Sequence, residues 1–253
     1  MKKYKILVVI ILIAGIMIIG KSNEFNNLLT YSKNIIDIPI ETIKQNEKIT
    51  ICIDPGHQLK GDSKTEQIAP NSNSYKIKVS SGTVGISTKK PEYELNLEAS
   101  LKLKNILEDR GYEVVMTRET HDVSISNKER AIFANEKKAD MVVRIHADSS
   151  NDQSITGACI LIPSQKNDTA NIYNDSFKCA NLVKDKMQNN GFKINCVLQR
   201  SDLTGFNWSE VPVILVEMGF MSNYVEDQNM ANPEYQNKMM TSIADGLDDY
   251  FNR

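Results

Sequence analysis

The sequence predicts an α/β fold: a single domain with a central, mostly parallel, twisted sheet flanked by helices, preceded by an N-terminal signal or anchor helix. Three observations support this prediction. From residue 49 onward, short apolar runs typical of buried strands alternate with longer amphipathic runs typical of helices. The first long run ends at Gly111 and a strand-like run follows at once, which is the short helix-to-strand turn of an α/β unit. The first 20 residues differ in composition from everything after them.

Residues 1–20 are predicted to be a signal peptide or a membrane anchor. Three lysines among the first five residues precede an uncharged run, 6–20, which has no polar face and therefore does not suit a helix of the domain. The run fits a signal-peptide core better than a full span, yet no clear cleavage site follows, so both alternatives stay open. Residues 21–48, in which Pro39 interrupts the only apolar patch, are interpreted as a tether. We expect an exported protein, secreted or membrane-anchored.

Composition narrows the classes of function. The formal net charge of −2 lacks the basic excess of a nucleic-acid-binding surface, so we expect no nucleic-acid partner. The four cysteines form no C-x-x-C pair, which argues against a zinc-finger or redox motif. We expect Cys52 and Cys159 to be small core residues and the chain to fold without a disulfide framework, although a disulfide stays open in an exported protein.

The domain begins at Ile49 with the stretch around which the rest is organised. Residues 49–57 are predicted to form an apolar strand followed by an Asp-Pro-Gly turn, which places His57 at the rim of a sheet. Residues 58–91 are rich in Gly, Ser, Thr, Lys and Asn, with a short alternating piece at 75–79. Such long segments inside a domain are usually functional or mobile, so we expect a flap beside the site.

The remaining elements follow from periodicity and from capping residues. Apolar positions three and four residues apart predict a helix over 92–110, ended by Gly111 and followed by a strand over 112–117. A Ser-x-x-Glu capping box at 126–129 predicts a helix from residue 127 to about residue 137. The later elements are strands over 141–145, 156–163 and 211–217 and helices over 169–190 and 233–251.

Two of the three histidines, His57 and His146, directly follow predicted strands. Two strands of one sheet can present their ends side by side, so this pair could share a metal. Glu92, in the first turn of the helix after the flap, is the candidate third ligand, because two histidines, a glutamate and a water are a standard tetrahedral zinc arrangement for hydrolysis. Glu217 closes the apolar run VPVILVE and is either a general base at the same rim or an exposed strand-end glutamate.

Six segments, taken together, form a recognisable pattern: IDPGHQ (53–58), EYELNLEAS (92–100), GYEVVMTR (111–118), NKERAIFAN (127–135), ADMVVRIHAD (139–148) and VPVILVEMGFMSN (211–223). In these segments the chain resembles the zinc-dependent N-acetylmuramoyl-L-alanine amidases of the amidase-3 family. The resemblance covers almost all of residues 49–253 and implies a catalytic domain that cleaves the amide bond between the lactyl group of N-acetylmuramic acid and the L-alanine of the peptidoglycan stem peptide.

Carried over residue by residue, the resemblance implies that His57, Glu92 and His146 bind Zn²⁺. It also implies that Glu217 is catalytic, accepting a proton from the attacking water and returning it to the leaving amine. The implied partner is peptidoglycan, together with the membrane if the N-terminal segment is uncleaved. A requirement for a protein activator cannot be read from the sequence.

Some features of the match leave alternatives. Glu94 and Glu98 are rivals for the ligand role, but Glu92 stands five residues before Leu97, as the family's ligand stands before its matching leucine. The usual DPGHGG is DPGHQL here, and the usual HAN is HAD, with Asp148 in place of asparagine. Both departures spare the implied ligands and bear on substrate contacts instead.

Other polar residues near the predicted rim have weaker signals. We expect Asp54 to orient the turn or support a ligand. Arg118 and Arg144 could bind substrate carboxylates, although arginines beside strand ends more often make structural ion pairs. Trp208 is expected either to flank the groove or to lie in the core, and His121 to be a surface residue. Rival functions are a zinc peptidase of wall peptides and an inactive wall-binding protein, and the sequence does not choose among wall turnover, cell separation and sporulation.

Overall fold

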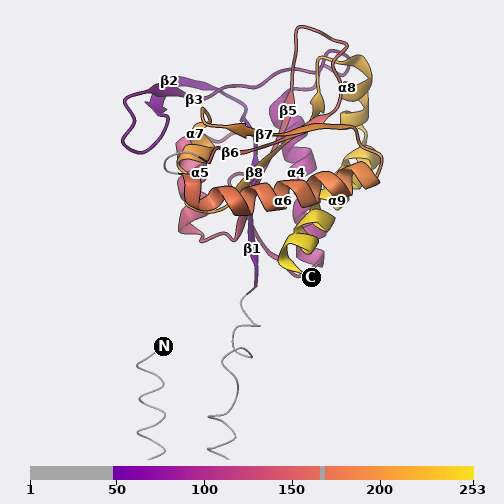
Figure 1. Ribbon diagram of the computed structural model, residues 1–253. Helices are drawn as coiled ribbons and strands as arrows, with labels where there is room; N and C mark the ends of the chain where they lie inside the picture. Colours follow the sequence, from indigo (N-terminus) through magenta and orange to yellow (C-terminus); the bar gives the residue numbers. More distant parts are fainter. Residues whose placement is uncertain (1–47, 166–168) are drawn as a thin grey trace, which may run out of the picture. The chain divides into compact units, whose positions relative to one another are not determined.

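A six-stranded sheet runs through the computed structural model, which describes residues 48–165 and 169–253 (Figure 1). Its strands are β1 (Thr50–Pro55), β4 (Glu113–Met116), β5 (Met141–Asp148), β6 (Ala158–Pro163), β7 (Ile194–Arg200) and β8 (Val213–Phe220). They lie in the order β4-β1-β5-β8-β6-β7, and all neighbours are parallel except β6 and β8. The prediction of an α/β fold with a mostly parallel sheet is confirmed.

Helices cover both faces of this sheet. One face packs against α4 (Glu92–Asp109), α6 (Ala170–Asn189) and α9 (Pro233–Phe251), and the other against α5 (Asn127–Glu136) and the short α7 (Thr204–Asn207). The strands divide their side chains between the faces: Ile51 and Ile53 of β1 join the larger core, whereas Cys52 joins the smaller one. A further helix, α8 (Tyr224–Ala231), follows β8 directly. Because β1, β5 and β8 are parallel neighbours in the sheet, their carboxyl ends lie side by side at one edge.

Capping residues set the helix ends where the sequence predicts them. The Ser126 hydroxyl accepts a hydrogen bond from the Glu129 backbone N–H, and the Glu129 carboxylate accepts one from the Ser126 N–H, which is a complete capping box. Gly111 has a φ of 82°, a left-handed conformation that ends α4 and turns the chain into β4. At the start of α9, Asn232 accepts a hydrogen bond from the Glu234 N–H.

The segment expected to be a flap contains a second, two-stranded sheet of β2 (Asp62–Gln67) and β3 (Tyr75–Val79). This hairpin is attached to its surroundings: the Asn127 side chain donates to the Lys78 carbonyl at 2.8 Å, and the Trp208 indole N–H donates to the Gln67 carbonyl at 2.9 Å. The alternating piece at 75–79 is the strand β3, and the antiparallel hairpin that it forms with β2 satisfies the backbone groups of both strands. The residues that follow β3 lead back to the sheet edge.

Two more elements and a disulfide were not predicted from the sequence. The edge strand β7 has no fully buried residue and was not predicted. The helix α8 was not predicted either, and it buries only Asp227 and Met230. Cys159 of β6 and Cys196 of β7 stand in register and form a disulfide, the alternative that stayed open for an exported protein, and Cys159 is partly buried rather than a fully buried core residue. Cys52 is free and buried, as expected.

The predicted signal or anchor segment, 1–20, and residues 21–47 of the predicted tether lie outside the described residues. Residues 48–253 form one of the two units into which the chain divides. In the part of the chain that the structure describes, the helices are all too short or too polar to span a bilayer.

Candidate active site

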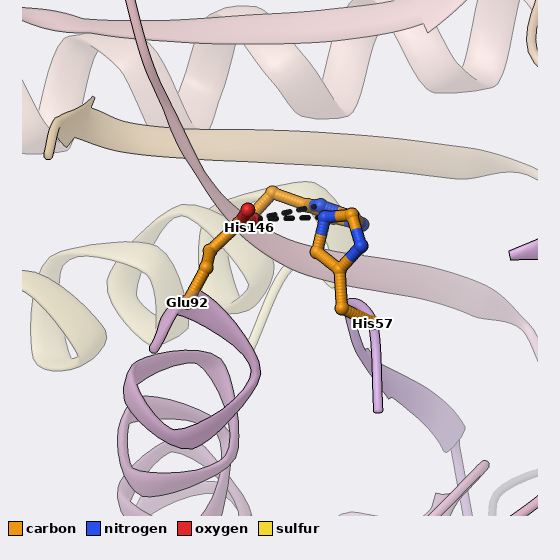
Figure 2. Close-up of side chains that lie close together, drawn as sticks. All are labelled: His57, Glu92 and His146. Atoms are coloured by element: carbon orange, nitrogen blue, oxygen red, sulfur yellow. Dashed lines mark ion pairs between the residues drawn. The ribbon is translucent and has the colours of Figure 1, made fainter. Parts of the chain in front are cut away.

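His57, Glu92 and His146 meet at the carboxyl edge of the sheet (Figure 2). They come from the turn after β1, the first turn of α4 and the end of β5. The Oε1 atom of Glu92 lies 3.1 Å from Nε2 of His57 and 3.3 Å from Nδ1 of His146, and the two imidazole centroids are 4.9 Å apart. Glu94 and Glu98 make hydrogen bonds elsewhere and stay outside this cluster. Three side chains far apart in the sequence thus face a common point.

This donor set fits a zinc ion. Two imidazoles and one carboxylate are ligands of catalytic zinc, and neighbouring ligands of a tetrahedral ion with bonds of 2.0–2.1 Å stand about 3.3 Å apart. The separations of 3.1 and 3.3 Å between the facing atoms match that value. Nδ1 of His146 is the nitrogen that faces Glu92, and Nε2 of the same ring is buried with no hydrogen-bond partner among the described residues.

Glu92 is held in place by hydrogen bonds to both carboxylate oxygens. Its Oε1 accepts from the Asn96 side chain at 3.1 Å and from the Ala147 N–H at 3.2 Å, and its Oε2 accepts from the Thr83 N–H at 3.0 Å. Burial alone would raise the pKa of Glu92, but hydrogen bonds from the two histidines hold this pKa well below its usual value. The carboxylate therefore stays charged, which is the state that binds a cation.

The two imidazoles are oriented by their surroundings. Nδ1 of His57 lies 2.9 Å from the Ser80 carbonyl oxygen and 3.0 Å from the Ser80 hydroxyl, which leaves Nε2 facing Glu92. The ring of His146 lies against Gly56, where a Cβ would come within 2.2 Å of the ring, so glycine is required there. Burial lowers the pKa of His146 to about 4, and the imidazole is neutral at physiological pH, as metal coordination requires.

Glu217 lies beside His146. The two residues are in register on the neighbouring parallel strands β8 and β5, so their side chains share one face of the sheet. Its Oε2 is buried without a hydrogen-bond partner among the residues that the structure describes. Burial, together with the negative charges of Glu92 and Asp148, raises the pKa of Glu217 well above its usual value. A carboxylate of raised pKa beside a set of metal ligands has the properties of a general base.

A raised pKa predicts that Glu217 destabilises the metal-free protein at neutral pH. Because the native state binds the proton more tightly than the unfolded state, the contribution of Glu217 to the free energy of unfolding falls as pH rises from the unfolded pKa through the native pKa. Each tenfold difference in proton affinity between the native and unfolded states changes the free energy of unfolding by about 1.4 kcal/mol. For a chain of this size, each kcal/mol changes the Tm by about 2–4 °C. We expect metal-free Glu217→Gln to melt higher than wild type at pH 7, with the gap closing near pH 4.

Thermal unfolding in the presence of a chelator, at pH 4 and pH 7, measures this effect. The matched control is Glu113→Gln, because the Glu113 side chain is exposed at the start of β4. The control should melt as wild type does at both pH values. Equal Tm values for Glu217→Gln and wild type at pH 7 would show that the burial of Glu217 carries no electrostatic penalty.

The predicted supporting residues lie directly beneath the site. Asp54 is buried and pairs with Arg130 and with Arg144, each at 2.7 Å. Charges and hydrogen bonds from these arginines and from Thr117 hold the pKa of Asp54 below its usual value, although its burial opposes this. Arg118 is also buried, and its hydrogen bonds within the described part of the chain all go to backbone carbonyls. Of the two roles considered for Arg118 and Arg144, binding of substrate carboxylates and structural contacts, their observed hydrogen bonds and ion pairs correspond to the structural one.

Trp208 and His121 are not members of the cluster of His57, Glu92 and His146. The Trp208 indole holds the β2–β3 hairpin, and the Lys128 ammonium lies 3.7 Å from its ring centroid. His121 packs the edge of its ring against Tyr93, with ring centroids 5.3 Å apart, and is only partly exposed rather than a free surface residue.

Several residues that orient the site were not singled out from the sequence: Ser80, Thr83, Asn96 and Arg130. Asn96 stands four residues after Glu92, the spacing that places two side chains on one helix face, and this signal could have identified it. Ser80 and Thr83 follow the β2–β3 hairpin and form hydrogen bonds with His57 and Glu92. No local sequence pattern indicates these hydrogen bonds. In the sequence, Arg130 resembles an ordinary exposed arginine on a helix, so its burial could not be predicted.

Comparisons with known proteins extend over nearly all of the unit 48–253. A family model described as N-acetylmuramoyl-L-alanine amidase, Amidase_3, matches residues 51–249. A candidate N-acetylmuramoyl-L-alanine amidase of Buchnera aphidicola is 28% identical over 82% of this chain and 97% of its own. The N-acetylmuramyl-L-alanine amidase Ami1 of Mycobacterium smegmatis superposes with a TM-score of 0.73 at 25% identity, covering 81% of this chain and 97% of its own. Ami1 of Mycobacterium abscessus, in its apo form, gives 0.72 at 26% identity over 80% and 98%.

Proposed function

The chain belongs to the Amidase_3 family of N-acetylmuramoyl-L-alanine amidases, and from this premise we propose that it hydrolyses peptidoglycan with a zinc ion held by His57, Glu92 and His146. The bond cleaved is the amide between the lactyl group of N-acetylmuramic acid and the L-alanine of the stem peptide. One observation carries the zinc assignment: three side chains with the donor atoms of a catalytic zinc site face one point at the carboxyl edge of the sheet, beside Glu217.

The chemistry can be divided between the ion and the chain. Zinc, when bound, polarises the amide carbonyl and lowers the pKa of water toward neutrality. Glu217 takes a proton from the attacking water, whose oxygen bonds to the carbonyl carbon, and then gives that proton to the amine of L-alanine as the carbon–nitrogen bond breaks. Its raised pKa makes Glu217 a stronger base than an exposed glutamate. The products are a free lactyl carboxylate and a peptide with a free L-alanine amino group.

Analysis of the reaction products distinguishes this proposal from a zinc peptidase with the same ligands. Purified peptidoglycan is incubated with the protein, and the newly formed amino groups are labelled and identified. We expect new L-alanine amino termini together with glycan strands whose lactyl groups are intact. New amino termini at any other residue of the stem or cross-bridge would identify a peptidase, and the absence of any cleavage would favour an inactive wall-binding protein.

We also propose a location outside the cytoplasmic membrane. The family description supports action on the cell wall, which lies beyond that membrane. Residues 1–20 would serve as the export signal, and as an anchor if they are uncleaved. Detection of the protein in membrane and wall fractions, with sequencing of its mature N-terminus, separates the anchored form from the secreted form.

A further inference from the structure

The turn that carries His57 has an uncommon backbone conformation. His57 has a φ of 60°, in the left-handed region that residues other than glycine seldom adopt. Holding such a residue there costs roughly 1–3 kcal/mol and requires surrounding structure that determines the conformation. The contacts of this turn show what does so: three successive carbonyl groups, those of Pro55, Gly56 and His57, accept hydrogen bonds from buried arginine side chains.

Arg130, from α5, makes two of these four hydrogen bonds. Its Nη1 donates to Asp54 and to the Pro55 carbonyl, both at 2.7 Å. Its Nη2 donates to the His57 carbonyl at 2.9 Å and to the Gln58 side chain at 3.2 Å. The side chain is 2% exposed, so water does not compete for these acceptors.

Arg118, from the loop after β4, holds the same turn from another direction. Its Nε donates to the Pro55 carbonyl at 3.0 Å, and its Nη2 donates to the Gly56 carbonyl at 2.8 Å. The same Nη2 reaches the Tyr93 carbonyl at 2.8 Å, in the residue next to Glu92. Arg118 therefore connects the turn that carries one candidate ligand to the helix start that carries another.

We propose that Arg130, assisted by Arg118, is a positioning residue for the metal: it holds the 55–57 turn so that the imidazole of His57 points at Glu92. This inference rests on the proposed role of His57 as a zinc ligand. The planar guanidinium suits the task, because its fixed fork of donors can bind four acceptors at once. A lysine at position 130 would keep the charge beside Asp54 but could not reach all four acceptors in that geometry.

The same ion-pair cluster provides a matched control. Arg144 pairs with Asp54 at the same distance of 2.7 Å and is also buried, but its other hydrogen bond goes to the Asn127 side chain. It makes no hydrogen bond to a carbonyl of the turn. Arg130→Lys and Arg144→Lys thus each weaken one of the two buried ion pairs of Asp54, and only the first loosens the turn.

The test measures zinc affinity in the full chain for wild type, Arg130→Lys and Arg144→Lys, by competition with a chelating dye. Thermal unfolding of the metal-free forms is measured in parallel. We expect both variants to lower the metal-free Tm, but Arg130→Lys alone to weaken zinc binding, by about 10–100-fold, the usual effect of removing a group that orients a ligand. The visible absorption of bound Co²⁺ should change in Arg130→Lys and not in Arg144→Lys.

Each alternative outcome has a definite meaning. If wild type binds zinc and Arg130→Lys binds it equally well, or if Arg144→Lys weakens binding as much, the positioning role is wrong while the proposed function stands. If wild type binds no zinc, the proposed function fails and this inference fails with it. Should Arg130→Lys not fold, Arg118→Lys serves instead, because it leaves the Asp54–Arg130 pair intact and is expected to weaken zinc binding in the same way.

Discussion

Replacing Glu217 with alanine is expected to lower turnover on peptidoglycan by roughly 10²–10⁴-fold, the usual contribution of a general base. The protein should keep its zinc, because Glu217 lies beside the three facing ligand atoms but is not one of them. Two quantities are measured on the same preparation: release of dye from labelled peptidoglycan, and zinc per chain by elemental analysis. The removal of a carboxylate of raised pKa should not reduce the Tm through electrostatics.

Glu113→Ala, at an exposed position of β4, serves as the control and should match wild type in activity and in zinc content. Normal activity of Glu217→Ala on purified peptidoglycan would refute the assignment of Glu217 as the base. A variant that lost its zinc together with its activity would instead place Glu217 within the metal site.

Replacing His146 with alanine is expected to remove both zinc and activity. One of three protein ligands is lost, and zinc affinity should fall by more than about 100-fold, which is the upper range for the loss of a mere supporting group. The deletion also leaves Glu92 without one of the two imidazoles whose hydrogen bonds keep its carboxylate charged. Zinc per chain after dialysis, with activity measured before and after zinc is added back, gives the readout.

His121→Ala is the matched control, because His121 is the third histidine of the chain and lies outside the cluster. It should keep the zinc content and the turnover of wild type. Loss of zinc in His121→Ala, or retention of a full zinc equivalent by His146→Ala, would mean that the metal is bound by a different set of residues.

Most of the candidate site residues could be predicted from the sequence because they stand at the ends of apolar runs. The runs that precede His57, His146 and Glu217 are short and strongly apolar, so they predict buried strands, and parallel strands bring their carboxyl ends to one edge. Glu92 begins a helix with clear periodicity. Local signals of this kind place a residue at an element's end, but they do not say which strands are neighbours. The order β4-β1-β5-β8-β6-β7 decided that these ends meet.

What the sequence did not predict depends on contacts between distant segments. The β2–β3 hairpin consists largely of polar residues and is held by bonds to α5 and to Trp208, so its own pattern resembles a loop. The edge strand β7 is half exposed and gives a weak apolar signal, and without it the pairing of Cys159 with Cys196 could not be expected. Arg130 lies on a helix whose sequence predicts only an ordinary charged residue.

A crystal structure of the zinc-loaded protein, with anomalous data collected at the zinc edge, tests the central claim most directly. We predict one strong anomalous peak within bonding distance of His57 Nε2, Glu92 Oε1 and an imidazole nitrogen of His146, with Glu217 beside it. A peak at other residues, or none between these three side chains in a protein that cleaves peptidoglycan, would contradict it.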